Sequence, residues 1–275
     1  MNNDVNYEIS SIDWNGRGYC GFPEPPSDFR SRFGTPTEVW HSWLTALFRA
    51  KCGSFDLLGE FPQVYKKIEH PILQELFATL LGDASPNSCF QAVIDELETT
   101  SSTELSMDFC DVLQSRGRLA DVPILLKVYQ KIAFVEDADI IPSYLSRLLE
   151  PKVDRLSNPS CFASFNDYCD EVMGFYNRLV DRFGTENILI FVGEQFSVNC
   201  LAKRILDEVR NPYFQSFLRR KFEASTGVDC TNFYKAGVLQ PLTAAAIVEE
   251  FLESPDAQKY EHGVRYFWGH RIPDE

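Results

Sequence analysis

Apolar residues recur at intervals of three and four positions through most of this chain, and this spacing constrains its fold more than any other feature. Residues at such intervals share one face of an α-helix, and that face must be buried against another element. The pattern therefore predicts a mostly α-helical protein. The segments that show it between residues 35 and 150 begin near Thr35, Pro71, Ser85, Thr103, Asp121 and Ile140.

Several segments also carry residues that begin or end helices. Thr35 and Glu38 match a capping box, and Pro36 fits the first turn of a helix. The helix after Pro71 is expected to stop at Gly82, because glycine readily adopts the left-handed conformation that follows a helix. These signals predict defined helix ends as well as helix faces.

Helix pairs are expected to begin near residues 36, 71, 103 and 140, at intervals of about 32 to 37 residues. Pairs at such a spacing can stack into a solenoid. The repeats share little sequence beyond the Pro-Ile-Leu found at Pro71 and again at Pro123. We therefore expect a HEAT-like solenoid or an irregular helical bundle, with a short irregular N-terminal arm.

The character of the sequence changes along the chain. Residues 1–34 are rich in glycine and proline and predict the irregular arm, in which Tyr7–Trp14 fits a short strand. Residues 35–150 form the helical-repeat-like region. A polar, proline-containing connector at 151–160 leads to a C-terminal helical region, residues 161–275, which we expect to pack with the former as one body.

The C-terminal region shows the helical period again, with one exception. Ile188–Val192 is a short apolar run that fits either a buried strand or a helical turn. Further helices are expected over residues 164–183, 197–210, 212–224 and 242–254.

The charge of the chain restricts its partners. Lysine and arginine total 26 against 40 aspartate and glutamate residues, so the net charge is −14. Nucleic acids and anionic lipids attract clustered lysine and arginine, so neither is expected to bind. The charge favours a basic protein partner or a merely solvated acidic surface.

The cysteine pattern indicates a reducing compartment, and the N-terminal sequence gives no indication of secretion. The eight cysteines are spread without a Cys-x-x-Cys pair, so we expect buried free thiols, no metal and a cytoplasmic location. The N-terminus lacks the apolar stretch of a signal peptide. The longest apolar run has five residues, far short of the roughly 20 that a membrane span requires.

One glycine motif resembles a phosphate-binding loop. Gly16, Gly18 and Gly21 match the spacing G-x-G-x-x-G, which in dinucleotide-binding folds opens a helix. Three prolines follow within residues 23–26 and prevent an immediate helix. The motif predicts a glycine-proline loop, and we expect no cofactor.

No sequence motif of a catalytic site is present. None of the four histidines forms a metal-binding pair, and no nucleophile elbow occurs. An enzyme remains an alternative, with a site assembled near the C-terminus from His262, His270 and Arg271. The main expectation is a protein that is not an enzyme.

Acidic clusters are the most persistent feature of the surface pattern. Each alone is typical of a solvated helix face, and together they could face a cationic protein. One such cluster, Glu249, Glu250 and Glu253, lies on the helix expected over residues 242–254. The residues that we expect to bind a partner are Glu136, Asp137, Asp139, Asp167, Asp170 and Glu171.

Two stretches, Thr35–Leu44 and Tyr266–Pro273, resemble bacterial immunity proteins of the polymorphic-toxin type. The resemblance would extend from about Thr35 to the end of the chain. It implies a protein that binds one cognate toxin and occludes its active site. The acidic residues named above are inferred from charge, since the resemblance carries no toxin-contacting residues. A helical scaffold that binds a protein or peptide remains the alternative function.

Overall fold

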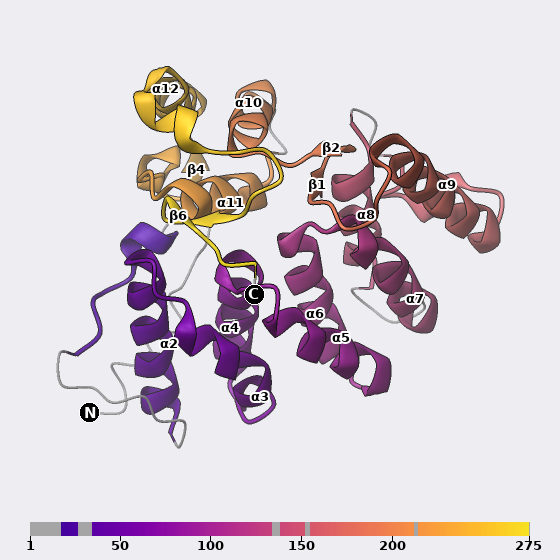
Figure 1. Cartoon of the computed structure of the whole chain (residues 1–275), viewed down its shortest axis with the longest axis horizontal. Coiled ribbons are helices and arrows are strands. Elements are labelled where there is room, and N and C mark those ends of the chain that lie inside the picture. The colour runs from indigo at the N-terminus through magenta and orange to yellow at the C-terminus, as the bar shows by residue number, and fades with distance from the viewer. Residues whose placement is uncertain (1–17, 27–34, 134–137, 152–154, 212–213, 275) are drawn as a thin grey trace. The chain divides into compact units, whose positions relative to one another are not determined.

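The computed structural model describes residues 18–26, 35–133, 138–151, 155–211 and 214–274, and its described part contains eleven α-helices (Figure 1). The prediction of a mostly α-helical protein is confirmed. The chain divides into two compact units: unit 1 comprises residues 1–89 and 197–275, and unit 2 comprises residues 90–196. Unit 1 therefore combines two segments that are far apart in the sequence.

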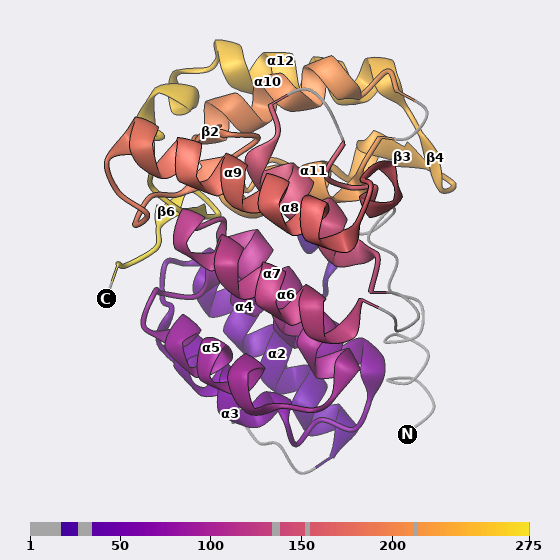
Figure 2. The same ribbon diagram turned by 90° about the vertical axis from the view of Figure 1, so that its right-hand side faces the viewer.

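Unit 1 is built around helix α4, which packs against α2 and also against α11. Helices α10 and α12 lie side by side in both ribbon views (Figures 1 and 2). Because α4 contacts a helix from the other end of the chain, this unit is an irregular bundle. Its helices are α2 (Pro36–Lys51), α3 (Phe61–Tyr65), α4 (Pro71–Ala84), α10 (Val198–Glu208), α11 (Ser216–Thr226) and α12 (Pro241–Glu253).

The ends of two of these helices show how local sequence and tertiary contacts compete. The predicted capping box is present at α2, where the hydroxyl of Thr35 accepts from the Glu38 amide at 3.2 Å. The predicted stop of α4 at Gly82 is wrong, since the helix continues to Ala84. The guanidinium of Arg265 donates to the carbonyl of Gly82 at 2.5 Å, which satisfies a group near the end of the helix.

Unit 2 is a second bundle, in which α8 packs against α6, α7 and α9. Helices α6 and α9 end at Gly117 and Gly184, both left-handed with φ of 77° and 69°, as the sequence signals predict. Its helices are α5, which begins at the last residue of unit 1 (Cys89–Thr99), α6 (Thr103–Arg116), α7 (Val122–Ile132), α8 (Ile140–Leu149) and α9 (Phe165–Phe183).

The described residues also contain three antiparallel hairpins, each formed by two strands of two residues. The run Ile188–Val192 contains one of these strands, and the expected strand at Tyr7–Trp14 lies outside the described residues. The sequence did not indicate the other two hairpins. The strands are β1 (Ile190–Phe191), β2 (Glu194–Gln195), β3 (Tyr234–Lys235), β4 (Val238–Leu239), β5 (Tyr266–Phe267) and β6 (His270–Arg271).

Two helix starts were predicted too early. Helix α5 begins at Cys89 instead of Ser85, and α11 begins at Ser216 instead of residue 212. Within the described ranges, no helix combines the length and apolar character needed to cross a membrane. The domain ranges expected from the sequence, 35–150 and 161–275, stay a prediction.

Candidate functional site

The acidic residues expected to bind a partner all belong to unit 2. Glu136 and Asp137 lie outside the described residues. Asp139 precedes α8 and is exposed, as are Asp167 and Asp170 on α9. None of these three exposed carboxylates forms an ion pair with another described residue.

The start of α8 and the first half of α9 meet at the side chain of Tyr129. Its ring centroid lies 5.6 Å from that of Phe165 and 5.9 Å from that of Tyr168. Burial, and then the charge of Asp139, raise the pKa of the Tyr129 phenol, which places that carboxylate near the same ring. The structure thus brings Asp139 close to the helix that carries Asp167 and Asp170.

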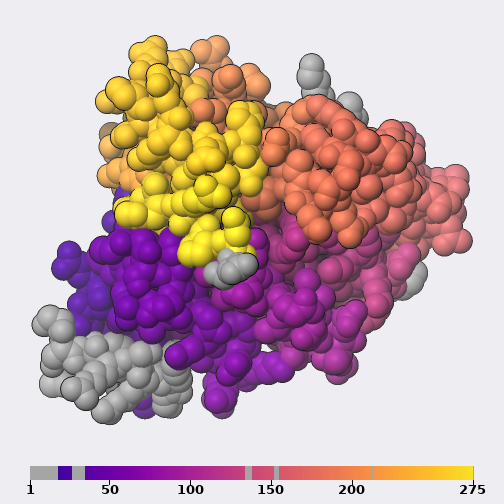
Figure 3. Space-filling view, viewed as in Figure 1, coloured from indigo at the N-terminus to yellow at the C-terminus, as the bar shows by residue number. Residues whose placement is uncertain are grey.

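Helix α9 buries one side and presents its carboxylates on the other. Tyr168 and Val172 are buried, whereas Asp167 and Asp170 point away from that side, as 100° per residue requires. The amide of Asp167 donates to the hydroxyl of Ser164 at 3.1 Å, which caps the helix. The residues of α9 form a continuous part of the visible surface (Figure 3).

Two features modify this acidic surface. Glu171 is half-buried and lies 3.9 Å from the guanidinium of Arg178, so its charge is partly offset. Ile140, next to Asp139, is 40 % exposed, although large apolar side chains are usually covered in a folded protein. The acidic surface thus combines exposed carboxylates with one exposed apolar side chain.

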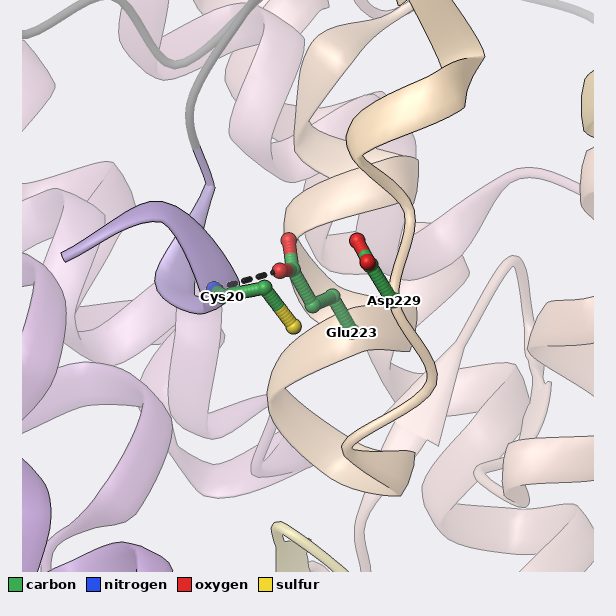
Figure 4. A group of neighbouring side chains, drawn as sticks. All are labelled: Cys20, Glu223 and Asp229. Atoms are coloured by element: carbon green, nitrogen blue, oxygen red, sulfur yellow. Dashed lines mark hydrogen bonds between the residues drawn. The ribbon is translucent and has the colours of Figure 1, made fainter.

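A second cluster of chemical groups lies in unit 1, where Cys20 faces Glu223 and Asp229 (Figure 4). One sulfur or oxygen atom from each lies within 4.8 Å of the others. The backbone amide of Cys20 donates to Oε1 of Glu223 at 2.8 Å. Within the described part of the glycine motif, residues 18–21, the amide of Cys20 therefore binds a carboxyl group, that of the chain's own Glu223.

Gly18 permits this contact because it leaves room for the glutamate. Its φ is 56°, a conformation that residues with a side chain rarely adopt. A Cβ atom there would lie 2.4 Å from Nη2 of Arg219 and closer still to the carboxylate of Glu223. Gly18 therefore allows a close approach of the backbone to these two side chains, which the sequence did not predict.

Cations already accompany the carboxylates of this cluster. Glu223 and Arg219 are both fully buried and form an ion pair of 3.5 Å. The ammonium of Lys51 donates to the carbonyl of Tyr19 at 2.8 Å and lies near enough to Cys20 and Glu223 to interact with their charges. A metal ion here would have to compete with these two cations, so the cluster is better suited to holding residues 18–22 against α11.

The pKa values of the Cys20 thiol and the Glu223 carboxyl are both raised, which favours the neutral form of each group. Burial, with the charge of Glu223, raises the pKa of the Cys20 thiol far above its usual value. Burial also raises the pKa of Glu223, against the opposing effect of Arg219. A catalytic nucleophile needs a thiolate near neutral pH, so Cys20 is unsuited to that role.

A neighbouring network in unit 1 is centred on the buried carboxylate of Asp83. The phenol of Tyr19 donates to it at 2.9 Å, Lys221 donates at 3.4 Å, and Arg220 lies 3.3 Å away. Burial lowers the pKa of Lys221 to about 8, although Asp83 opposes this shift. The network joins α4, α11 and the segment at Tyr19 through charged hydrogen bonds.

The alternative catalytic residues are not members of the Cys20 cluster or of the Asp83 network. His262, His270 and Arg271 are exposed, and Arg271 pairs with Glu261 at 3.5 Å and with Asp274 at 3.6 Å. His270 packs over Gly53, whose absent Cβ would lie 2.9 Å from Nδ1 of the imidazole. These contacts belong to the exposed strand β6, which holds His270 and Arg271, whereas His262 lies in the segment before β5.

The cysteines differ from the expectation of uniformly buried thiols. All eight are free. Cys52 and Cys161 are exposed, so the expectation is wrong for these two, because each lies at the end of a helix or turn instead of on an apolar helix face. The buried thiols are Cys89, Cys110, Cys169 and Cys230.

Sequence reasoning did not identify the buried charges of unit 1. Arg219, Glu223 and Lys221 appear in a charged stretch that resembles an ordinary solvated helix. The only signal was the spacing of Arg219 and Glu223, which allows an ion pair within one helix. No family model, curated protein or solved structure matches the chain.

Proposed function

We propose that this chain is an immunity or inhibitor protein that binds a cationic protein toxin and occludes its active site, without catalysis of its own. The observation that carries the proposal is the exposed acidic surface of unit 2, formed by Asp139, Asp167 and Asp170 beside the exposed Ile140. Asp167 also accepts a hydrogen bond from the hydroxyl of Ser164 at 2.7 Å, whereas Asp139 and Asp170 form no ion pair among the described residues. Exposed carboxylates speed the association with a cationic partner and make it selective.

The composition of unit 2 supports the same function. It contains 18 aspartate and glutamate residues against nine lysine and arginine residues, a net charge of −9 out of −14 for the whole chain. A field of this sign attracts a basic protein over distances of about 8 Å at physiological salt. Toxins that act on nucleic acids need basic surfaces, so they are partners of the required chemistry.

Co-expression with the product of the neighbouring gene in a sensitive bacterial host tests the proposal. We expect the gene product alone to stop growth, and this chain to restore growth and to co-purify with it. The variant D139N/D167N/D170N should restore growth less well. The matched variant D95N/E98Q/E104Q changes the charge equally at exposed positions on α5 and α6, and should protect like the wild type. Absence of both toxicity and a complex would contradict the proposal.

A scaffold function is a second candidate, and one cavity favours it. About 140 Å³ of space lies between α5 and α7, with an apolar lining and with Lys127 and Lys131 among its residues. Lys127 is 3.7 Å from Glu98, and both are exposed. We expect an acidic, leucine-containing peptide to bind here. Fluorescence anisotropy of the labelled peptide measures this binding, and the variant K127E/K131E should abolish it. Equal binding by that variant would exclude this site.

A further inference from the structure

Helix α12 of unit 1 has an exposed face that no other described element covers. Its buried residues are Ala244, Val248 and Phe251. At 100° per residue, the exposed residues fall within an arc of about 120° on the opposite side. Both ribbon views place the helix at the edge of unit 1 (Figures 1 and 2). The exposed residues of this face are Leu242, Thr243, Ala246, Glu249, Glu250 and Glu253.

The first turn of this face is apolar. Leu242 is 79 % exposed, and Val238 in the preceding strand is 64 % exposed. These are the two most exposed large apolar side chains among the residues that the structure describes. The turn at Ala236 and Gly237, with φ of 51° and 75°, forms the tip of the hairpin that carries Val238. Neither side chain contributes to the core, so both are available to a partner.

The last turns of the same face are acidic. Glu249, Glu250 and Glu253 lie where the helix dipole is already negative, and the last turn contains no basic residue. Glu249 and Glu253 are four residues apart, so their charges repel each other. None of the three forms an ion pair within the described part of the chain. This arrangement weakens the helix slightly and leaves, among the described residues, three carboxylates without an ion pair on one face.

The charge and the apolar first turn of this face indicate which class of partner can bind it. Its carboxylates repel the phosphates of nucleic acids and of anionic lipids. In a second copy of this chain, bound through the same face, the carboxylates would meet either carboxylates or the apolar first turn, and neither neutralises their charge. A cationic protein segment with an apolar end satisfies both halves of the face.

We propose that the exposed face of α12, together with Val238, is a docking surface for a basic amphipathic helix of a partner protein. The distance along α12 from Leu242 to Glu249 and Glu253 is roughly 10 to 17 Å at 1.5 Å per residue. The partner helix therefore places leucine-like side chains on Val238 and Leu242, and lysine or arginine two to three turns further along. This surface belongs to unit 1 and does not depend on the acidic surface of unit 2.

Fluorescence anisotropy with a labelled 16-residue helical peptide tests the proposal. The peptide carries leucines in its first two turns and lysines in its last two, and a control peptide replaces the leucines by glutamine. We expect the leucine peptide to bind the full chain at least tenfold more tightly than the control peptide. Equal affinities for the two peptides, or no binding of either, would overturn the proposal.

Three variants of the chain locate the bound peptide. V238S/L242S and E249Q/E250Q/E253Q should each weaken binding at least tenfold, and only the second should also reduce its salt dependence. The control D95N/E98Q/E104Q in unit 2 should bind within twofold of the wild type. An equal loss in the control would mean that net charge alone attracts the peptide, and would overturn the docking surface. Unchanged melting temperatures identify variants that keep their fold. The test leaves the toxin-binding proposal untouched, because that concerns other residues and another readout.

Discussion

Unit 1 keeps several charged side chains inside, whereas unit 2 carries most of the net charge of the chain on its surface. In unit 1, Arg219 and Glu223 are fully buried, and Asp83 is 1 % exposed. In unit 2, Asp139 and Asp170 are exposed. The described part of unit 2 also contains a buried ion pair, between Arg116 and Asp121 at 3.6 Å, so the difference is one of degree.

The comparison separates two uses of charge. A buried charge requires a partner, so removal of one member leaves the other uncompensated and strongly destabilises the fold. An exposed charge interacts mainly with water, so its removal changes stability little and affects partners more. The buried charges of unit 1 should therefore matter for folding, and the exposed charges of unit 2 for binding.

The largest expected effect is the loss of the Arg219 guanidinium. R219M leaves Glu223 buried without its cation, and we expect the free energy of unfolding to fall by about 3–5 kcal/mol in urea denaturation. The matched variant in unit 2 is R182M, because Arg182 pairs with Glu194 at 2.7 Å with both side chains about half exposed. That variant should lose only about 0.2–1 kcal/mol.

A double variant sharpens this test. R219M/E223M removes both buried charges and should recover part of the stability lost in R219M. If the double variant were no more stable than the single one, the uncompensated carboxylate would not be the cause of the loss.

Two glycines with positive φ compare the units next, Gly18 at φ 56° and ψ −172° and Gly184 at φ 69° and ψ 9°. G18A should cost about 3 kcal/mol, because the strain at positive φ adds to the broken contact with Glu223. G184A in unit 2 should cost about 1–2 kcal/mol, because its φ is 69° and no atom lies within 4 Å of the added Cβ. Thermal and urea unfolding measure both. Equal losses would contradict the expectation that the contact with Glu223 and the glycine-specific backbone of Gly18 add to the cost.

The pH dependence of stability tests whether the pKa of the buried Lys221 is lowered. The folded pKa of Lys221 is about 8, against 10.5 in the unfolded chain. Between these values the unfolded chain holds the proton and the folded chain does not, so this residue makes stability rise with pH. Tyr19 and Cys230 have raised pKa values and act in the opposite direction, so wild type must be compared with K221M.

The difference in unfolding free energy between wild type and K221M should increase from pH 8 to 10. Its slope should not exceed about 1.4 kcal/mol per pH unit. A difference that stays constant or decreases over this range would argue against a lowered pKa for Lys221.

The sequence predicts the helices better than the contacts between them. Periodicity identified α2 and α9 with nearly correct ends, because their caps at Thr35 and Ser164 are local. The end of α4 was wrong because Arg265, about 180 residues away, supplies the hydrogen bonds that extend it. Tertiary contacts of this range leave no local signal in a single sequence.

The candidate sites differ in the same way. Exposed acidic residues such as Asp170 can be recognised from their place on the polar side of a helix. The buried cluster at Glu223 could not be recognised in this way, because the burial of a charged side chain depends on which distant segment covers it. The hairpin at β5 and β6 was missed because its two-residue strands are shorter than any periodic signal.

The most direct test of the account measures the association rate of the purified chain with its cationic partner, at low and physiological salt, for wild type and D139N/D167N/D170N. Wild type should associate faster, with a steeper salt dependence, while the unfolding free energies of the two proteins agree within about 0.5 kcal/mol. Equal rates and equal salt dependence would contradict the claim that the exposed carboxylates of unit 2 serve binding.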